Sequence, residues 1–322
     1  MNGNSVKLIT CLAALLFLIV TGCESQQKAR ETAQAEEYFT IGMAYFELGR
    51  YADAEVWLNR ARAVDKTLIA SEYNLGRIAY ETGRFTVAAE YFENVLAQDP
   101  DNIMALQATA FMRIRSGDLK RAEELYDRVL EILPESVDNG FNYALVLYGL
   151  EKYEESEKVL AKYPDALKEN PSAILLTARA QRAQNKVEAI DSYAGWLEIY
   201  TGDPNPQIFY EYAQVLEKAE HYARALDQYD HAIEALTKDT ASLTMANLRF
   251  KKARILLAVD PENEEGIDGF FFAIDNGFSD TEAIEELLSD ERVTSDNKEE
   301  IRNALYDIYN KQRNTTEQST GT

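Results

Sequence analysis

A repeat of 34 residues constrains the fold of this chain more than any other feature. Four successive segments each carry a small residue, a second small residue twelve positions later, and a large residue four positions after that. Twelve residues suffice to finish one helix, turn and begin the next, so the small residues predict close contact between two antiparallel helices. We expect the large residue to fill the space beside that contact, because it lies on the same face of the second helix. In chain order the three sets are Gly42, Gly76, Ala110 and Ala144, then Ala54, Ala88, Ala122 and Ser156, then Leu58, Phe92, Tyr126 and Leu160.

The residues between the predicted helices support this pairing. Gly49, Gly83 and Gly117 each stand just before a second helix, where a residue that tolerates positive φ ends the first one. Pro100 and Pro134 follow second helices. With only 7 Pro and 15 Gly in 322 residues, the chain lacks the many tight turns of an all-β protein. These observations predict an all-α chain.

The pattern resembles the tetratricopeptide repeat family, whose 34-residue helix-turn-helix unit has small residues at places 8, 20 and 27 and large ones at places 4, 11, 17 and 24. Repeats that begin at Ala35, Ile69, Ile103 and Val137 put the first small residue at place 8. The resemblance implies an all-α, right-handed superhelical solenoid with a C-terminal helical cap. It covers about residues 35–275, as about seven repeats at 35–68, 69–102, 103–136, 137–169, 170–205, 206–246 and 247–277.

The later repeats keep fewer of these residues, and the chain after them fits a cap. The fifth repeat has no glycine in its turn, and the seventh, near Asn247, follows a lengthened segment. Because a solenoid needs a polar last layer, we expect residues 278–313 to cap it, through a capping box from Ser279 to Glu282 and an amphipathic helix. The cap should cover one of three successive phenylalanines, although a functional apolar patch is the alternative. The three phenylalanines are Phe270, Phe271 and Phe272, at the end of the last repeat. The amphipathic helix of the cap carries Ile301, Leu305 and Ile308, and residues 314–322 are predicted to be a disordered tail.

The first 23 residues have the composition of an export signal. Lys7 precedes an apolar run over residues 8–20, which as a helix would reach about 20 Å and fall short of the roughly 30 Å apolar core of a bilayer. The segment 20–23, Val-Thr-Gly-Cys, resembles the lipobox of bacterial lipoproteins, whose cysteine is acylated and becomes the new N-terminus. The resemblance implies a signal peptide over 1–22, a palmitate-type anchor on Cys23 and a polar tether over 23–34. An ordinary secretory signal is the alternative.

Charge and motifs exclude several classes of function. A net charge of −22 disfavours a nucleic-acid binder, and 46% hydrophobic residues argue against disorder. Anionic lipid headgroups would repel the negatively charged mature chain, so only its lipid anchor would hold it at a membrane. The sequence has no Walker loop, no dinucleotide fingerprint, no zincin motif and no Cys-x-x-Cys, and we predict no metal and no cofactor. His221 and His231 have no nucleophile motif nearby and are predicted to be surface residues, so we predict a non-enzymatic protein.

Acidic residues are concentrated near the C-terminus. Residues 260–300 contain fifteen acidic and two basic residues. A solubilising end cap that prevents solenoids from stacking and an electrostatic dock for a basic partner both fit this tract.

The resemblance also implies a binding groove. In tetratricopeptide folds the first helices of successive repeats line the concave face, and places 2, 5, 9 and 12 look into it. Here this row is strongly aromatic and lacks the Lys and Asn residues with which some family members grip acidic C-termini. An extended apolar or aromatic peptide would suit it; alternatively, the rings pack on each other or on an N-terminal segment. The predicted groove residues are Phe39, Met43, Phe46, Tyr73, Arg77, Tyr80, Gln107, Phe111, Ile114, Phe141, Leu145 and Tyr148.

Two functions fit these features. The first is a lipid-anchored scaffold of the bacterial cell envelope, on the periplasmic face or the cell surface, that binds an envelope or periplasmic protein. The second is an accessory lipoprotein of a solute transport system, which binds a periplasmic solute-binding protein or a small hydrophobic ligand. The sequence leaves both open, together with the oligomeric state.

Overall fold

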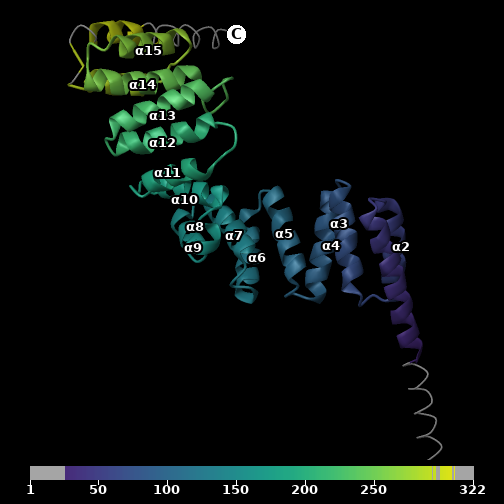
Figure 1. Cartoon of the computed structure of the whole chain (residues 1–322). Helices are drawn as coiled ribbons and strands as arrows, with labels where there is room; N and C mark the ends of the chain where they lie inside the picture. The colour runs from purple at the N-terminus through teal and green to yellow at the C-terminus, as the bar shows by residue number, and fades with distance from the viewer. Residues whose placement is uncertain (1–25, 292, 295–297, 307, 309–322) are drawn as a thin grey trace, which may run out of the picture. The chain divides into compact units, whose positions relative to one another are not determined.

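The computed structural model describes residues 26–291, 293–294, 298–306 and 308, which form helices joined by short turns (Figure 1). Within these ranges there is no β-strand. The predicted signal peptide, Cys23, the end of the predicted cap and the predicted tail over 314–322 lie outside the described residues. The chain divides into two compact units, Met1–Ala166 and Leu167–Thr322, termed the N-terminal and C-terminal units below.

The N-terminal unit is a succession of helices in which, from α2 to α8, each helix packs against the next one along the chain (Figure 1). A helix over residues 26–47 precedes them. The first residues of α3, α5 and α7 are Ile69, Ile103 and Val137, where the sequence analysis places the starts of three repeats. The bounds are α2 Tyr51–Val64, α3 Ile69–Glu81, α4 Phe85–Gln98, α5 Ile103–Arg115, α6 Leu119–Ile132, α7 Val137–Gly149, α8 Tyr153–Leu160 and α9 Pro164–Leu167.

The C-terminal unit continues the same pattern, and the consecutive helices α10 to α15 pack against one another in chain order. The predicted seventh repeat begins two residues earlier than expected, because Thr244 caps α14 by accepting a hydrogen bond from the Asn247 amide. A last helix covers residues 298–306. The bounds are α10 Pro171–Ala183, α11 Ala189–Ile199, α12 Pro206–Lys218, α13 Tyr222–Ala235, α14 Met245–Val259, α15 Glu264–Asp275 and α16 Thr281–Ser289.

The small residues of the repeat lie where paired helices touch, as predicted. A Cβ atom added at Gly42 would lie 2.8 Å from Leu58 Cγ, and one added at Gly76 would lie 2.6 Å from Phe92 Cε1. Carbon atoms in favourable contact are about 3.5–4.0 Å apart. Glycine at place 8 therefore makes room for the large residue of the second helix, and this pairing is confirmed.

The turns between paired helices keep one backbone geometry along the chain. Gly49, Gly83 and Gly117 have φ values of 69°, 76° and 80°, which confirms the predicted helix ends. Non-glycine residues take over the same conformation in the next three pairs, at Glu151, Asn185 and Glu220, with φ values of 61°, 58° and 60°. The later repeats thus keep the turn while losing its sequence signal.

The segment predicted to be a polar tether is helical where the structure describes it. Residues 26–34, predicted to be part of a polar tether, are helical and continue into the first helix of the repeats. Their sequence consists of Gln, Lys, Ala, Arg, Glu and Thr, most of which are good helix formers, and polarity alone does not distinguish an exposed helix from a coil. Hydrogen bonds from Gln27 to Glu31 and from Gln34 to Tyr38, each four residues apart, support the helix.

The C-terminal cap covers one phenylalanine of the three, as predicted. Phe270 is 1% exposed, whereas Phe272 is 41% exposed. The predicted capping box is displaced by one residue, because the Asp280 side chain, rather than that of Ser279, accepts the capping hydrogen bond, here from the Ala283 amide. Phe270 shares its buried cluster with Phe250, Phe278, Ile284, Leu287, Ile301, Leu305 and Ile308.

Candidate functional site

An open pocket of about 450 Å³ lies among α3, α5 and α7 of the N-terminal unit, and we call it the aromatic pocket. It brings together five of the twelve predicted groove residues, namely Tyr73, Arg77, Tyr80, Gln107 and Phe111. All twelve are half-buried or exposed, so none belongs to the fully buried core. The other residues that line the pocket are Glu81, Phe92, Met104, Ala108, Met112, Tyr126, Asp138, Asn139 and Asn142.

The aromatic rings of the pocket are held by contacts with each other and with the core. Tyr73 packs on the buried Phe92 with ring centroids 5.5 Å apart, and Tyr80 meets Phe111 edge-on at 5.7 Å. Burial raises the pKa of the Tyr73 phenol, against the opposing effect of the Arg77 guanidinium, so the phenol stays protonated at neutral pH. Phe111 remains 42% exposed and offers an open apolar face.

Arg77 is fixed from two sides. Its guanidinium carbon lies 4.4 Å from the centroid of the Phe46 ring, and its Nη1 atom donates a hydrogen bond of 3.0 Å to Asn74 Oδ1. The Asn74 side chain in turn donates to the Ala70 carbonyl. The charge of Arg77 is therefore presented to the pocket from a held position, which lowers the entropic cost of using it in binding.

Amide side chains form the polar part of the pocket on α5 and α7. Gln107 Nε2 donates to Asn139 Oδ1 at 2.9 Å, and Asn139 Nδ2 donates to the Ser136 hydroxyl. Asn142 lines the same wall. Amides both donate and accept, so they suit the backbone of an extended peptide.

The remaining predicted groove residues lie on the same helices and outside the aromatic pocket. Phe39 and Phe46 pack around the Leu58 cluster, and Ile114 packs against the core at α5 and α6. Tyr148 meets Tyr153 edge-on at 5.3 Å. Part of the aromatic row thus packs ring on ring, as the alternative interpretation expected. The other three are Met43 and Phe141, both half-buried, and Leu145, which is exposed.

Sequence reasoning missed several residues of this pocket, and two of them carried a signal. Met104 and Asp138 stand at place 2 of the third and fourth repeats, a position that the family pattern already directs into the groove. Glu81, Asn139 and Asn142 stand at places outside that pattern. Their contribution depends on how neighbouring helices are rotated, which the repeat alone does not specify.

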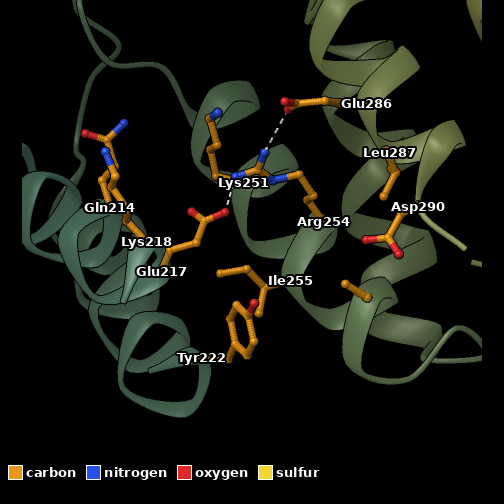
Figure 2. Close-up of a pocket in the computed structure, with 11 residues that line it drawn as sticks. Gln214, Glu217, Lys218, Tyr222, Lys251, Arg254, Ile255, Glu286, Leu287 and Asp290 are labelled. Carbon is orange, nitrogen blue, oxygen red and sulfur yellow. Dashed lines mark hydrogen bonds and ion pairs between the residues drawn. The ribbon is translucent and has the colours of Figure 1, made fainter. Parts of the chain in front are cut away.

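A second pocket, of about 470 Å³, lies in the C-terminal unit and was not predicted; we call it the charged pocket (Figure 2). In Figure 2 the Arg254 guanidinium lies between the carboxylates of Glu217 and Glu286, to which it forms ion pairs. Two of the carboxylates that line the pocket, Glu286 and Asp290, belong to the acidic tract over residues 260–300. The lining residues are Gln214, Glu217, Lys218, Tyr222, Lys251, Arg254, Ile255, Ala258, Glu286, Leu287 and Asp290.

Neither pocket holds a histidine, and both histidines are exposed, as predicted. His231 stacks on Phe209 with ring centroids 5.4 Å apart. Among the described residues, no cluster of three His, Cys, Asp or Glu side chains is arranged to hold a metal ion. No helix in the same part of the chain is long and apolar enough to cross a bilayer.

Paired helices with small residues at their contacts define a helical repeat protein, and the comparisons with known proteins agree. Models of the tetratricopeptide repeat match residues 35–68, 73–137 and 113–181. Over these ranges, within residues 35–181, the chain consists of tetratricopeptide repeats, and the predicted family resemblance is confirmed there. The predicted fold class, an all-α solenoid of helix-turn-helix repeats with a C-terminal helical cap, is confirmed.

Similar proteins are found among lipoproteins and solved repeat structures. The chain is 26% identical over 188 residues to an uncharacterized lipoprotein of Treponema pallidum, an alignment that covers 58% of this chain and 93% of the relative. A tetratricopeptide repeat protein of Parabacteroides merdae superposes with a TM-score of 0.52 at 21% identity, covering 79% of this chain and 97% of that one. YrrB, a repeat protein with an unusual peptide-binding site, gives a TM-score of 0.51 at 17% identity, covering 56% and 92%.

Proposed function

We propose that this protein is a lipid-anchored, non-enzymatic scaffold of the bacterial cell envelope that binds an extended segment of a partner protein in its aromatic groove. The fold is that of a protein–protein interaction scaffold. The aromatic pocket is the observation that carries the proposal, because it combines exposed apolar rings, a held cation and amide groups in one place. Each of these features suits a different part of a peptide.

The division of roles within the pocket follows from its chemistry. Tyr73, Tyr80 and Phe111 provide a surface for an apolar or aromatic side chain, with little conformational entropy to lose. Arg77 is placed to donate to backbone carbonyls or to one acidic side chain of the partner. Gln107 and Asn142 are placed to exchange hydrogen bonds with the partner backbone.

Anchoring through Cys23 is the second part of the proposal. The lipobox-like segment supports it, and so does the relative that is itself a lipoprotein. A protein tethered in this way would act at a bacterial membrane surface and meet partners that share that surface. Two proteins held at the same membrane surface have a high effective concentration, so the groove would be occupied even if its affinity for the partner were low.

The experiment that tests the groove compares two double variants of the full chain in native cells. Tyr73→Ala with Tyr80→Ala removes rings from the aromatic pocket, and Tyr200→Ala with Tyr306→Ala removes two exposed rings of the C-terminal unit. Chemical crosslinking followed by identification of captured proteins should lose its main product with the first pair and keep it with the second. Equal capture by both pairs would remove the basis of the proposal.

A further inference from the structure

Two lysines that line the charged pocket, Lys218 and Lys251, form no ion pair with its carboxylates in the described part of the chain. Arg254 is paired with Glu217 and Glu286, and Lys218 donates a hydrogen bond to Asn185. Lys251 lines the pocket, and its ammonium group makes no hydrogen bond or ion pair with the described part of the chain. In Figure 2 the Lys251 side chain points away from Tyr222, toward the top of the view, and lies nearer to Gln214 than to Asp290.

Lys251 is also partly removed from water. Burial lowers the pKa of its ammonium group, and the Arg254 guanidinium lowers it further, against the opposing carboxylates of Glu217, Asp280 and Glu286. A half-buried charge without a partner is unfavourable, and an anion bound beside it would relieve that cost. The Lys251 ammonium group is therefore the one cationic group in the described pocket lining that lacks both a hydrogen-bond and an ion-pair partner and could take up a negative charge.

Part of the pocket wall is apolar. Ile255 and Leu287 are almost fully buried residues whose side chains line it, and Ala258 and Tyr222 add further apolar surface. Its volume of about 470 Å³ is within the range of pockets for small molecules, which are about 300–1,000 Å³. A bare inorganic anion would leave most of this space and the apolar wall unused.

We propose that the charged pocket binds a small organic monocarboxylate, whose carboxylate pairs with Lys251 and whose hydrocarbon body contacts Ile255 and Leu287. The carboxylates of Glu217, Glu286 and Asp290 around the pocket disfavour a second negative charge on the ligand. A cationic ligand is disfavoured by the unneutralised ammonium. This site is separate from the aromatic pocket, and its occupancy does not depend on the proposed scaffold function.

Four small probes that differ in charge or in hydrocarbon body test the proposal on the full chain in lipid nanodiscs, with empty nanodiscs subtracted. Pentanoate carries a single negative charge and the body, pentan-1-ol the body alone, pentylammonium the opposite charge with the body, and inorganic phosphate a negative charge of one to two without the body. Isothermal titration calorimetry should find one saturable site for pentanoate and at least tenfold weaker binding of the other three. Phosphate or pentylammonium bound as tightly as pentanoate would overturn the proposal.

Variants then assign the site to its cation. Lys251→Met should weaken pentanoate binding at least tenfold, Lys251→Arg should keep it within about threefold, and Lys238→Met, at an exposed lysine outside the pocket, should leave it unchanged. If Lys251→Met alters the helical circular dichroism spectrum, an NMR measurement on the wild-type protein replaces the variant as the test of the site. After isotopic dimethylation of its lysines, pentanoate should shift the NMR resonance assigned to Lys251 more than any other. Equal binding by folded Lys251→Met, or an unmoved Lys251 resonance at saturation, would contradict the assignment.

Discussion

At the scale of single residues, the fold depends on where side chains are absent. Gly76 stands where α3 meets α4, and the Phe92 ring occupies the space that a larger residue would need. Gly195, in α11, has no heavy atom within 4 Å of its missing Cβ position. Glycine is therefore required for helix packing at position 76. At position 195 it contributes only the entropic cost of a flexible backbone in a helix.

Matched substitutions at these two glycines should change stability in opposite directions. Gly76→Ala forces the buried Phe92 ring to move, and overpacking costs about 1–3 kcal/mol, more than the gain of up to about 1 kcal/mol in helix propensity. Gly195→Ala keeps that gain without the clash, so it should raise the free energy of unfolding by about 0.5–1 kcal/mol. Urea denaturation followed by circular dichroism measures both. A Gly76→Ala protein as stable as the wild type would show that the helix contact is looser than described.

At the scale of helices, the sequence predicted the front repeats better than the back ones for a physical reason. In the first three pairs, glycine both permits the positive φ of the turn and marks it in the sequence. Asn185 and Glu220 adopt the same positive-φ conformation. Asn and Glu also occur in many other types of local structure, so their presence in the sequence does not predict a turn. The helix bounds follow from local signals of this kind.

The sites were less predictable than the helices. Five residues of the aromatic pocket followed from the family places because they lie at regular positions on first helices. The charged pocket could not be predicted in this way, since Glu217, Arg254 and Glu286 come from α12, α14 and the cap helix α16. The repeats bring Glu217 to Arg254, and the packing of the cap on the last repeat adds Glu286.

The cap provides a matched pair for a stability prediction. Phe270 is buried with the cap residues Ile301 and Leu305, whereas Phe272, on the same helix, is 41% exposed. Phe270→Ala should cost about 3–5 kcal/mol, and Phe272→Ala less than about 1 kcal/mol, because only the first leaves a cavity. Thermal and urea unfolding should separate the two variants clearly. Equal losses would mean that the cap does not rest on Phe270.

At the scale of the whole molecule, a proposed lipid anchor at Cys23 precedes two proposed binding sites, one in each unit. The net charge of −22 makes attraction of the protein body to anionic headgroups unfavourable. Attachment would therefore depend on the acyl chains alone, and a single substitution tests it.

Changing the two cysteines one at a time should separate the anchor from the rest of the signal. Cys23→Ser should leave an unacylated precursor that keeps its N-terminal segment, and Cys11→Ser should be processed normally, because Cys11 lies in the apolar run of the signal. Metabolic labelling with a palmitate analogue, with the size of the product on a gel, gives the answer. Label that persists on the Cys23→Ser protein would end the lipobox interpretation.

Site-specific photocrosslinking tests whether the partner lies in the aromatic pocket. A photoreactive phenylalanine placed at Phe111, which is 42% exposed in the pocket, should give one discrete crosslinked product in native cells. The same group at Val56, which is 51% exposed on α2, should give none. Tyr73→Ala with Tyr80→Ala should abolish the Phe111 product. A product of equal yield from Val56, or one that survives the loss of both tyrosines, would contradict the account.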